Sequence, residues 1–322
     1  MKPLVSICCL TYNHAPYVAQ ALDGMLMQKD VDFEILIHDD ASTDGTDEII
    51  RDYECRYPDI IKALYEKENQ YSLYAAKGFT NTSAIFNFPR AKGKYIAMCE
   101  GDDFWNDEHK LSIQSSYMEE HDDCTLSFHS AHMIVGSADK PSGMMRPYKQ
   151  ERMVTPQEII DKKSGYPTAS LMLRTDVMMK LPQFYMKAPI GDIPIQLTMA
   201  ADGYGYYFDM PMCTYRYARS GSWTQELLTS PDAKARQARY AQQMKEMYER
   251  FDEYTHGRYH DEARRAYERI LYSTKVNTRD WAAIYDPSAK TYLDELPLMT
   301  RMLMRLEKDA PQLFKALQRL RS

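Results

Sequence analysis

Three carboxylate side chains near residue 100 have the spacing of a metal-binding turn. Glu100, Asp102 and Asp103 fall within four residues and directly follow the apolar segment 94–99. Such carboxylates repel one another unless a cation or hydrogen-bond donors compensate their charge. Mg²⁺ and Mn²⁺ prefer a few carboxylate oxygens together with phosphate oxygens. The turn therefore predicts a metal and phosphate site, although a solvated acidic turn would have the same composition.

Two further polar groups come after apolar segments that are typical of buried strands. They are Thr11, Tyr12 and Asn13 after residues 4–10, and Asp39 and Asp40 soon after residues 33–37. The first group could hold a base or ribose, with the tyrosine stacked on the base, or it could be ordinary turn chemistry. For the aspartates, ligand contact is favoured, because Ser42 or Asp44 would suffice to cap the helix that follows.

The elements that must position these groups alternate between strands and helices. Segments 4–10, 33–37 and 94–99 are nearly continuous apolar runs, as expected for strands covered on both faces. Helical spacing of apolar residues separates them, which predicts right-handed crossovers and a mainly parallel sheet. Ligands of such sheets bind beyond the carboxyl ends of the strands. We therefore predict an α/β fold of Rossmann-like type, with all three polar groups along one rim of the sheet.

Composition excludes several classes of function. The chain has 322 residues, an apolar share of 44% and a formal charge of −6. The negative charge argues against a nucleic-acid binder, and an anionic nucleotide would need a metal ion. The six cysteines lack C-x-x-C spacing, so a zinc site is not expected. There is no apolar run of about 18 residues that could span a membrane, and no signal-like segment at the start.

The chain changes character after residue 225. Residues 231–322 are rich in Ala, Arg, Glu, Lys, Met and Tyr, and their apolar residues recur at helical spacing. Breaks are expected near Gly257, Pro287 and Pro311. We interpret residues 1–225 as one α/β domain and residues 226–322 as a region of three or four helices.

Three stretches together resemble the family 2 glycosyltransferases, whose nucleotide-binding domain has the GT-A fold. They are VSICCLTYNH at 5–14, HDDASTDGT at 38–46 and AKGKYIAMCEGDDFW at 91–105. Order and spacing match over residues 3–135, and a looser likeness extends to about residue 225. The resemblance implies an inverting, Mn²⁺- or Mg²⁺-dependent transferase. It would move a sugar from a nucleotide-diphospho-sugar, expected to be a UDP-sugar, to a saccharide or lipid-linked acceptor in cell-surface polysaccharide synthesis.

The resemblance also implies roles for residues of the donor side. Thr11 and Asn13 would line the nucleotide pocket with Tyr12 near the base, and either Asp39 or Asp40 would contact the base. Asp103 would be the metal ligand and Asp102 would lie near the ribose or the metal. Glu100 stands where the family has the leading Asp of a D-x-D-type motif.

On the acceptor side the resemblance implies that Asp192, in the segment Gly191-Asp192-Ile193-Pro194, is the general base. The same residue would also suit a helix N-cap, since aspartate is preferred there. Residues 167–170 resemble the acceptor-side segment that precedes this base. Arg216, in a strand-like segment, could face the phosphates, or it could simply be solvated.

Two other functions are compatible with parts of this pattern. A sugar nucleotidylyltransferase would share a related sheet, but it needs a Gly-rich basic loop after the first strand, and Thr11 to His14 supply none. A non-catalytic nucleotide-binding protein would have lost acidic residues that are all present here. We expect a cytoplasmic protein, or one at the cytoplasmic face of a membrane. There the Arg and Tyr residues of its C-terminal helices would approach lipid headgroups.

Overall fold

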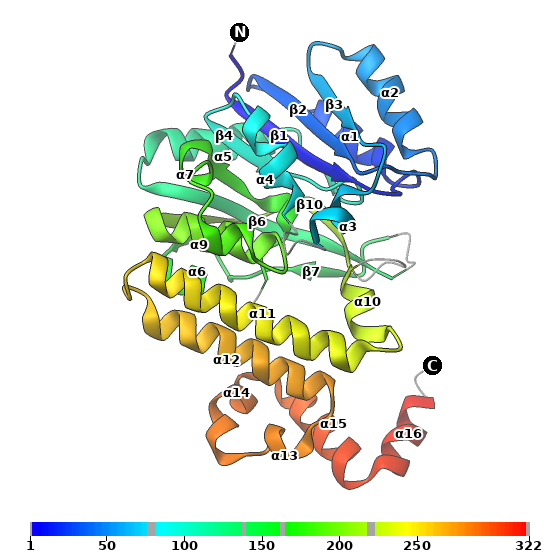
Figure 1. Ribbon diagram of the computed structural model, residues 1–322, viewed down its shortest axis with the longest axis vertical. Coiled ribbons are helices and arrows are strands. Elements are labelled where there is room, and N and C mark those ends of the chain that lie inside the picture. Colours follow the sequence, from blue (N-terminus) through cyan, green and yellow to red (C-terminus); the bar gives the residue numbers. More distant parts are fainter. Residues whose placement is uncertain (1, 76–80, 137–139, 162–164, 218–222, 320–322) are drawn as a thin grey trace.

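A computed structural model describes residues 2–75, 81–136, 140–161, 165–217 and 223–319 (Figure 1). The three predicted apolar strands and one further strand, β3, form the first half of one sheet. They are β1 (Val5–Thr11), β2 (Phe33–Asp39), β3 (Ile61–Tyr65) and β4 (Tyr95–Met98). They pair in parallel in the order β3-β2-β1-β4. The predicted parallel pairing is therefore confirmed for this half.

Both faces of these strands are buried, as their continuous apolar sequences predict. In β1, Ile7 and Cys9 pack on one face in a cluster with α1 (Val18–Leu26) and α2 (Thr46–Arg56). Cys8 points to the other face and packs in a second cluster. This alternation follows from the two-residue repeat of an extended strand. The sheet is therefore the middle layer between two apolar cores.

The second half of the sheet is mixed in direction. β9 (Met172–Arg174) is antiparallel to both β4 and β6 (Cys124–Val135), and β10 (Tyr204–Tyr217) is parallel to β6. β5 (Phe104–Trp105) closes the order on the other side of β10. Two short strands are added to this half: β7 (Gly143–Met145) pairs with β6, and β8 (Arg152–Val154) pairs with β10.

Short helices connect the strands. α3 (Gln70–Ala75), α4 (Thr82–Phe86) and the 3₁₀ turn η1 (Phe88–Arg90) precede β4, and α5 (Lys110–Glu120) follows β5. Beyond β8 come α6 (Pro156–Ile160), the 3₁₀ turn η2 (Thr168–Ser170), α7 (Thr175–Met178), α8 (Gln183–Met186) and α9 (Asp192–Asp202). α6 begins with a capping box, which Thr155 and Glu158 form.

The C-terminal part is helical, as predicted, but divided into more pieces. It contains α10 (Trp223–Thr229), α11 (Ala233–Tyr254), α12 (His260–Asn277), α13 (Trp281–Ile284), η3 (Pro287–Ala289), α14 (Lys290–Glu295), α15 (Leu298–Asp309) and α16 (Pro311–Arg319). The chain breaks at the three predicted positions, with Gly257 at a positive φ of 74°. In the described part of the chain, every helix is too short or too polar to cross a bilayer.

The long helix α11 lies against the sheet domain rather than apart from it (Figure 1). Its side chains Met244, Met247 and Phe251 are fully buried in the same cluster as Phe128 of β6. The ring of Phe251 meets that of Phe184 in α8 at 5.3 Å. The predicted boundary between residues 225 and 226 falls inside α10, and the division into two domains stays a prediction.

Candidate metal and nucleotide site

The three polar groups named from the sequence meet at one edge of the sheet. β1, β2 and β4 are parallel neighbours, so their carboxyl ends lie together. The backbone N–H of Asp40 donates to Thr11 O at 2.9 Å, and that of Gly101 donates to Leu10 O at 2.9 Å. These bonds continue the sheet pairing into the polar turns and fix the turns against one another.

Gly101 allows the acidic turn to sit against the end of β1. A Cβ atom added at residue 101 would lie 2.5 Å from the Thr11 side chain and 2.9 Å from Nδ1 of His14. Any larger residue would therefore displace the turn. Sequence reasoning did not single out His14, whose Nε2 lies 3.9 Å from Oδ2 of Asp102. The sequence feature that could have identified His14 as part of the site is its position directly after Asn13.

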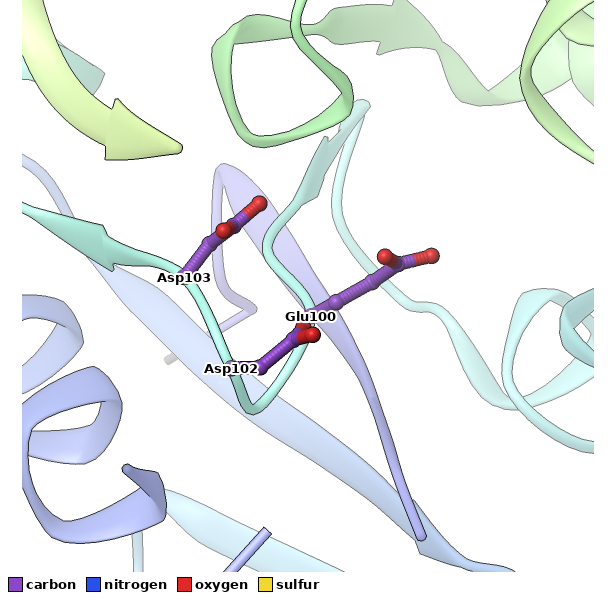
Figure 2. A group of neighbouring side chains, drawn as sticks. All are labelled: Glu100, Asp102 and Asp103. Carbon is purple, nitrogen blue, oxygen red and sulfur yellow. The ribbon is translucent and has the colours of Figure 1, made fainter. Parts of the chain in front are cut away.

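The acidic turn holds its three carboxylates together. One oxygen each from Glu100, Asp102 and Asp103 lies within 4.8 Å of the others (Figure 2). The three side chains project from one tight turn, while their backbone follows β4 and leads into β5. This clustering of like charge is the arrangement that the sequence predicted.

Asp103 is the most buried member of the cluster, with 1% of its surface exposed. Its Oδ1 accepts the backbone N–H of Arg216 at 2.8 Å. Its Oδ2 is buried without a hydrogen-bond partner among the described residues. Burial and then the charge of Asp102 raise the pKa of Asp103 well above its usual range. A buried, partly unsatisfied carboxylate beside two others fits a hard divalent cation, which prefers oxygen ligands.

Arg216 lies at this cluster, as the sequence suggested, but its side chain is held by the protein. The guanidinium lies over the rings of Tyr17 and Phe104, at 4.7 and 5.0 Å from their centroids. It donates to the backbone oxygen of Asp102 and, at 2.7 Å, to Oε1 of Gln20. The alternative of a merely solvated arginine is therefore wrong, and phosphate contact stays a prediction.

Thr11 and Asp39 are joined by hydrogen bonds at the ends of β1 and β2. Thr11 Oγ1 donates to Asp39 Oδ1 at 2.8 Å, and Ser42 Oγ donates to the same oxygen at 2.6 Å. Asn13 adopts a positive φ of 54°, and its Oδ1 accepts the backbone N–H of Thr43 at 2.9 Å. These contacts order the rim of the candidate nucleotide pocket.

Asp40 accepts hydrogen bonds from the start of α3. Its carboxylate oxygens take the backbone N–H groups of Gln70 at 2.5 Å and Tyr71 at 2.9 Å. Asp44 accepts the backbone N–H of Thr46 at 3.1 Å, but the N-cap of α2 is Gly45, so neither Ser42 nor Asp44 is the predicted cap. Ligand contact was favoured for Asp39 and Asp40, but Asp40 instead has partners at the start of α3. Base contact by either Asp39 or Asp40 stays a prediction.

The half-buried Asp192 is the first residue of α9, and the N-cap position of the helix is occupied by Gly191. The structure thus does not support the alternative of an N-cap. The charge of Asp192 and the charges of the acidic turn both act on Tyr215 of β10. Burial raises the pKa of Tyr215, and the charges of Asp103, Glu100, Asp192 and Asp102 raise it further. The candidate base and the candidate metal ligands therefore act electrostatically on the same tyrosine, which sequence reasoning missed.

A sequence model described as "Glycosyl transferase family 2" matches residues 6–178, more than half of the chain. Among curated relatives, an uncharacterised protein of Mycobacterium tuberculosis is 36% identical over 143 residues, 43% of this chain and 38% of the relative. The putative teichuronic acid biosynthesis glycosyltransferase TuaG of Bacillus subtilis is 35% identical over 127 residues, 39% of this chain and 46% of TuaG. The chain thus matches less than half the length of each relative.

Solved structures with the same architecture include two named glycosyltransferases. TarS 1–349 of S. aureus in complex with UDP-GlcNAc has a TM-score of 0.61 at 15% identity, covering 96% of this chain and 87% of TarS. The mannosyltransferase PcManGT of Pyrobaculum calidifontis, in complex with GDP-Man and Mn²⁺, has a TM-score of 0.50 at 16% identity, covering 98% and 83%. At these identities the likeness shows the fold, which is GT-A.

Proposed function

Because the chain belongs to the glycosyl transferase family 2, we propose that it is an inverting, metal-dependent transferase that uses a UDP-sugar. Glycosyl transfer is the activity that the family and the GT-A fold support. The UDP preference draws on the TarS complex with UDP-GlcNAc. The acceptor in this proposal is a saccharide or lipid-linked saccharide of a cell-surface polysaccharide. That setting draws on the relative named for teichuronic acid biosynthesis.

The observation that carries the proposal is the carboxylate cluster around the buried Asp103. Asp103 and Asp102 would hold the metal ion, and Glu100 adds a third carboxylate within 4.8 Å. When bound, Mn²⁺ or Mg²⁺ would neutralise the negative charge of the departing diphosphate. The manganese complex of PcManGT supports this choice of ions.

The nucleotide would lie along the rim formed by the ends of β1 and β2. Tyr12 is 47% exposed, so its ring is available to stack on a base. Thr11 and Asn13 are already ordered by hydrogen bonds to the 39–46 turn. A rim ordered in advance loses less conformational entropy when the donor binds. Arg216, stacked between two rings beside the acidic turn, would face the phosphates.

Asp192 would act as general base. Its carboxylate would take the proton of the acceptor hydroxyl as that oxygen attacks the anomeric carbon of the donor. The bond from the anomeric carbon to the diphosphate oxygen breaks in the same step, and the nucleoside diphosphate leaves with the bonding electrons. A single displacement inverts the anomeric configuration. Its position after the N-cap Gly191 supports this role, because the carboxylate of Asp192 is not the N-cap of α9.

A binding experiment on the full chain tests the donor assignment. UDP and GDP would be titrated by calorimetry with and without Mn²⁺, followed by a thermal-shift screen of UDP- and GDP-sugars. We expect tight UDP binding that depends on Mn²⁺. Tighter GDP binding would replace the UDP assignment, and binding that ignores Mn²⁺ would overturn the metal assignment.

A further inference from the structure

The helices α15 and α16, at the end of the molecule distant from the first strands, carry the most exposed apolar side chains (Figure 1). Among the described residues, the four most exposed large apolar side chains all lie here, each between 55% and 65% exposed. They are Leu298, Met299, Met302 and Leu313. Single exposed apolar residues are ordinary, but a concentration of them on neighbouring helices marks an interaction surface.

α15 has separate inward and outward faces. Met304 points inward and is buried with Tyr272 and Ile284, while Glu307 pairs with Arg279 at 2.9 Å. Leu298, Met299 and Met302 point outward; on a helix with 3.6 residues per turn they share an arc of about 100°. The outward residues therefore are not part of the packing that holds α15 in place.

Positive charge accompanies this apolar face. Residues 297–322 contain six Lys or Arg and two acidic residues, within a chain whose formal charge is −6. The side chain of Arg305 is 74% exposed, and Lys308 and Lys315 are also exposed. This end of the molecule is thus basic and apolar, whereas the rest carries a net negative charge.

We propose that the outward face of α15, together with the basic residues of α15 and α16, docks on an anionic lipid surface. Leu298, Met299 and Met302 would enter the boundary between headgroups and acyl chains, while Arg305 and Lys308 would meet lipid phosphates. The occupant is a bilayer rather than a second copy of the chain. A two-fold contact through this face would bring its basic residues against their own copies.

This surface differs from the sequence-based expectation, which relied on Arg and Tyr residues throughout the C-terminal helices. The structure assigns the contact to three apolar side chains of α15 and their basic neighbours. The inference does not depend on the proposed transfer reaction, since lipid binding needs neither donor nor metal. Failure of either proposal would therefore leave the other standing.

A vesicle co-sedimentation assay on the full chain tests the docking surface. The vesicles would contain phosphatidylcholine alone, or phosphatidylcholine and phosphatidylglycerol in equal parts. We expect binding to the mixed vesicles and a loss of about tenfold or more in the double variant Leu298→Ser, Met302→Ser. The matched control is Met153→Ser with Met210→Ser, which removes exposed apolar side chains from β8 and β10 and should bind normally.

A charge variant separates the electrostatic part of the interaction. Arg305→Gln with Lys308→Gln should weaken binding to the mixed vesicles by about tenfold or more, and raised salt should reduce this difference. Equal binding of the Leu298→Ser, Met302→Ser variant and the unsubstituted chain would overturn the proposal. Absence of binding of the unsubstituted chain to the anionic vesicles would also overturn it. A third contradicting result would be a dimer of the unsubstituted chain in sedimentation velocity that the Leu298→Ser, Met302→Ser variant abolishes. Unchanged melting temperatures would confirm that the variants are folded.

Discussion

Replacing Asp103 by asparagine should stabilise the metal-free protein and abolish its response to metal. The side chain is buried, and its Oδ2 has no hydrogen-bond partner among the described residues. An asparagine can keep the oxygen that accepts the Arg216 N–H and lacks the negative charge. We expect a metal-ligating carboxylate to lower the stability of the metal-free protein and to be needed for its response to metal.

The separation of the carboxylates sets the size of the effect. The carboxylate oxygens lie within 4.8 Å of one another, and two unit charges at that limit repel by about 3 kcal/mol at an effective dielectric constant of about 20. Asp103 can avoid this repulsion by taking up a proton, which at pH 7 costs an ordinary aspartate about 4 kcal/mol. The gain in unfolding free energy for Asp103→Asn is therefore between about 1 and 4 kcal/mol. The midpoint of thermal unfolding should rise by about 2–8 °C.

Thermal and urea unfolding at pH 7, with a chelator and then with Mn²⁺ and UDP, measures both parts of this prediction. The control is Asp59→Asn, which removes an exposed carboxylate outside the site. The unsubstituted chain and the control should gain stability from Mn²⁺ and UDP, whereas Asp103→Asn should not. A lower metal-free stability of Asp103→Asn, or a full response to Mn²⁺, would refute the reasoning.

Three further outcomes are expected. Asp192→Asn should keep Mn²⁺-dependent UDP binding and lower transfer by about 10²-fold or more, as measured by calorimetry and by turnover; retained turnover would exclude the base role. Phe251→Ala should cost about 3–5 kcal/mol in urea unfolding, because the ring is fully buried between α11 and the sheet domain; a loss below about 1 kcal/mol would show that α11 packs loosely. Lys110 is fully buried, and burial lowers its pKa to about 8, so the folded protein binds fewer protons than the unfolded chain between pH 8 and 10.5. The stability of the unsubstituted chain relative to Lys110→Met should therefore rise by about 3 kcal/mol across that range, and a flat difference would contradict the lowered pKa.

Local patterns predicted much of the fold. The strands β1, β2 and β4 were found because buried parallel strands are continuous apolar runs. The antiparallel insertion of β9 between β4 and β6 was not predicted. Its three residues resemble any short apolar segment, and strand direction depends on distant pairing. The burial of α11 in the main core was missed for a related reason, since helical spacing does not identify the partner of the apolar face.

The sequence predicted where the candidate site lies in the fold, but it predicted fewer of the contacts that its side chains make. Parallel strands place their carboxyl ends together, so the meeting of Asn13, Asp40 and Asp103 followed from the order of elements. The contact of Asp40 with α3 could not be foreseen, because the start of α3 is polar and weakly periodic. Tyr215 reaches the site from β10, more than a hundred residues after the acidic turn, and only tertiary pairing brings it there.

The burial of α11 in the core limits which segments of this chain can be exchanged with those of a related protein. The matched family segment ends at residue 178, yet Met244 and Phe251 complete the same apolar layer as β6 and α8. A chimera that joined residues 1–230 to the C-terminal helices of another enzyme would bring two unrelated surfaces together. A graft that keeps this apolar layer intact would require α8, α9 and α11 to be transferred as one unit.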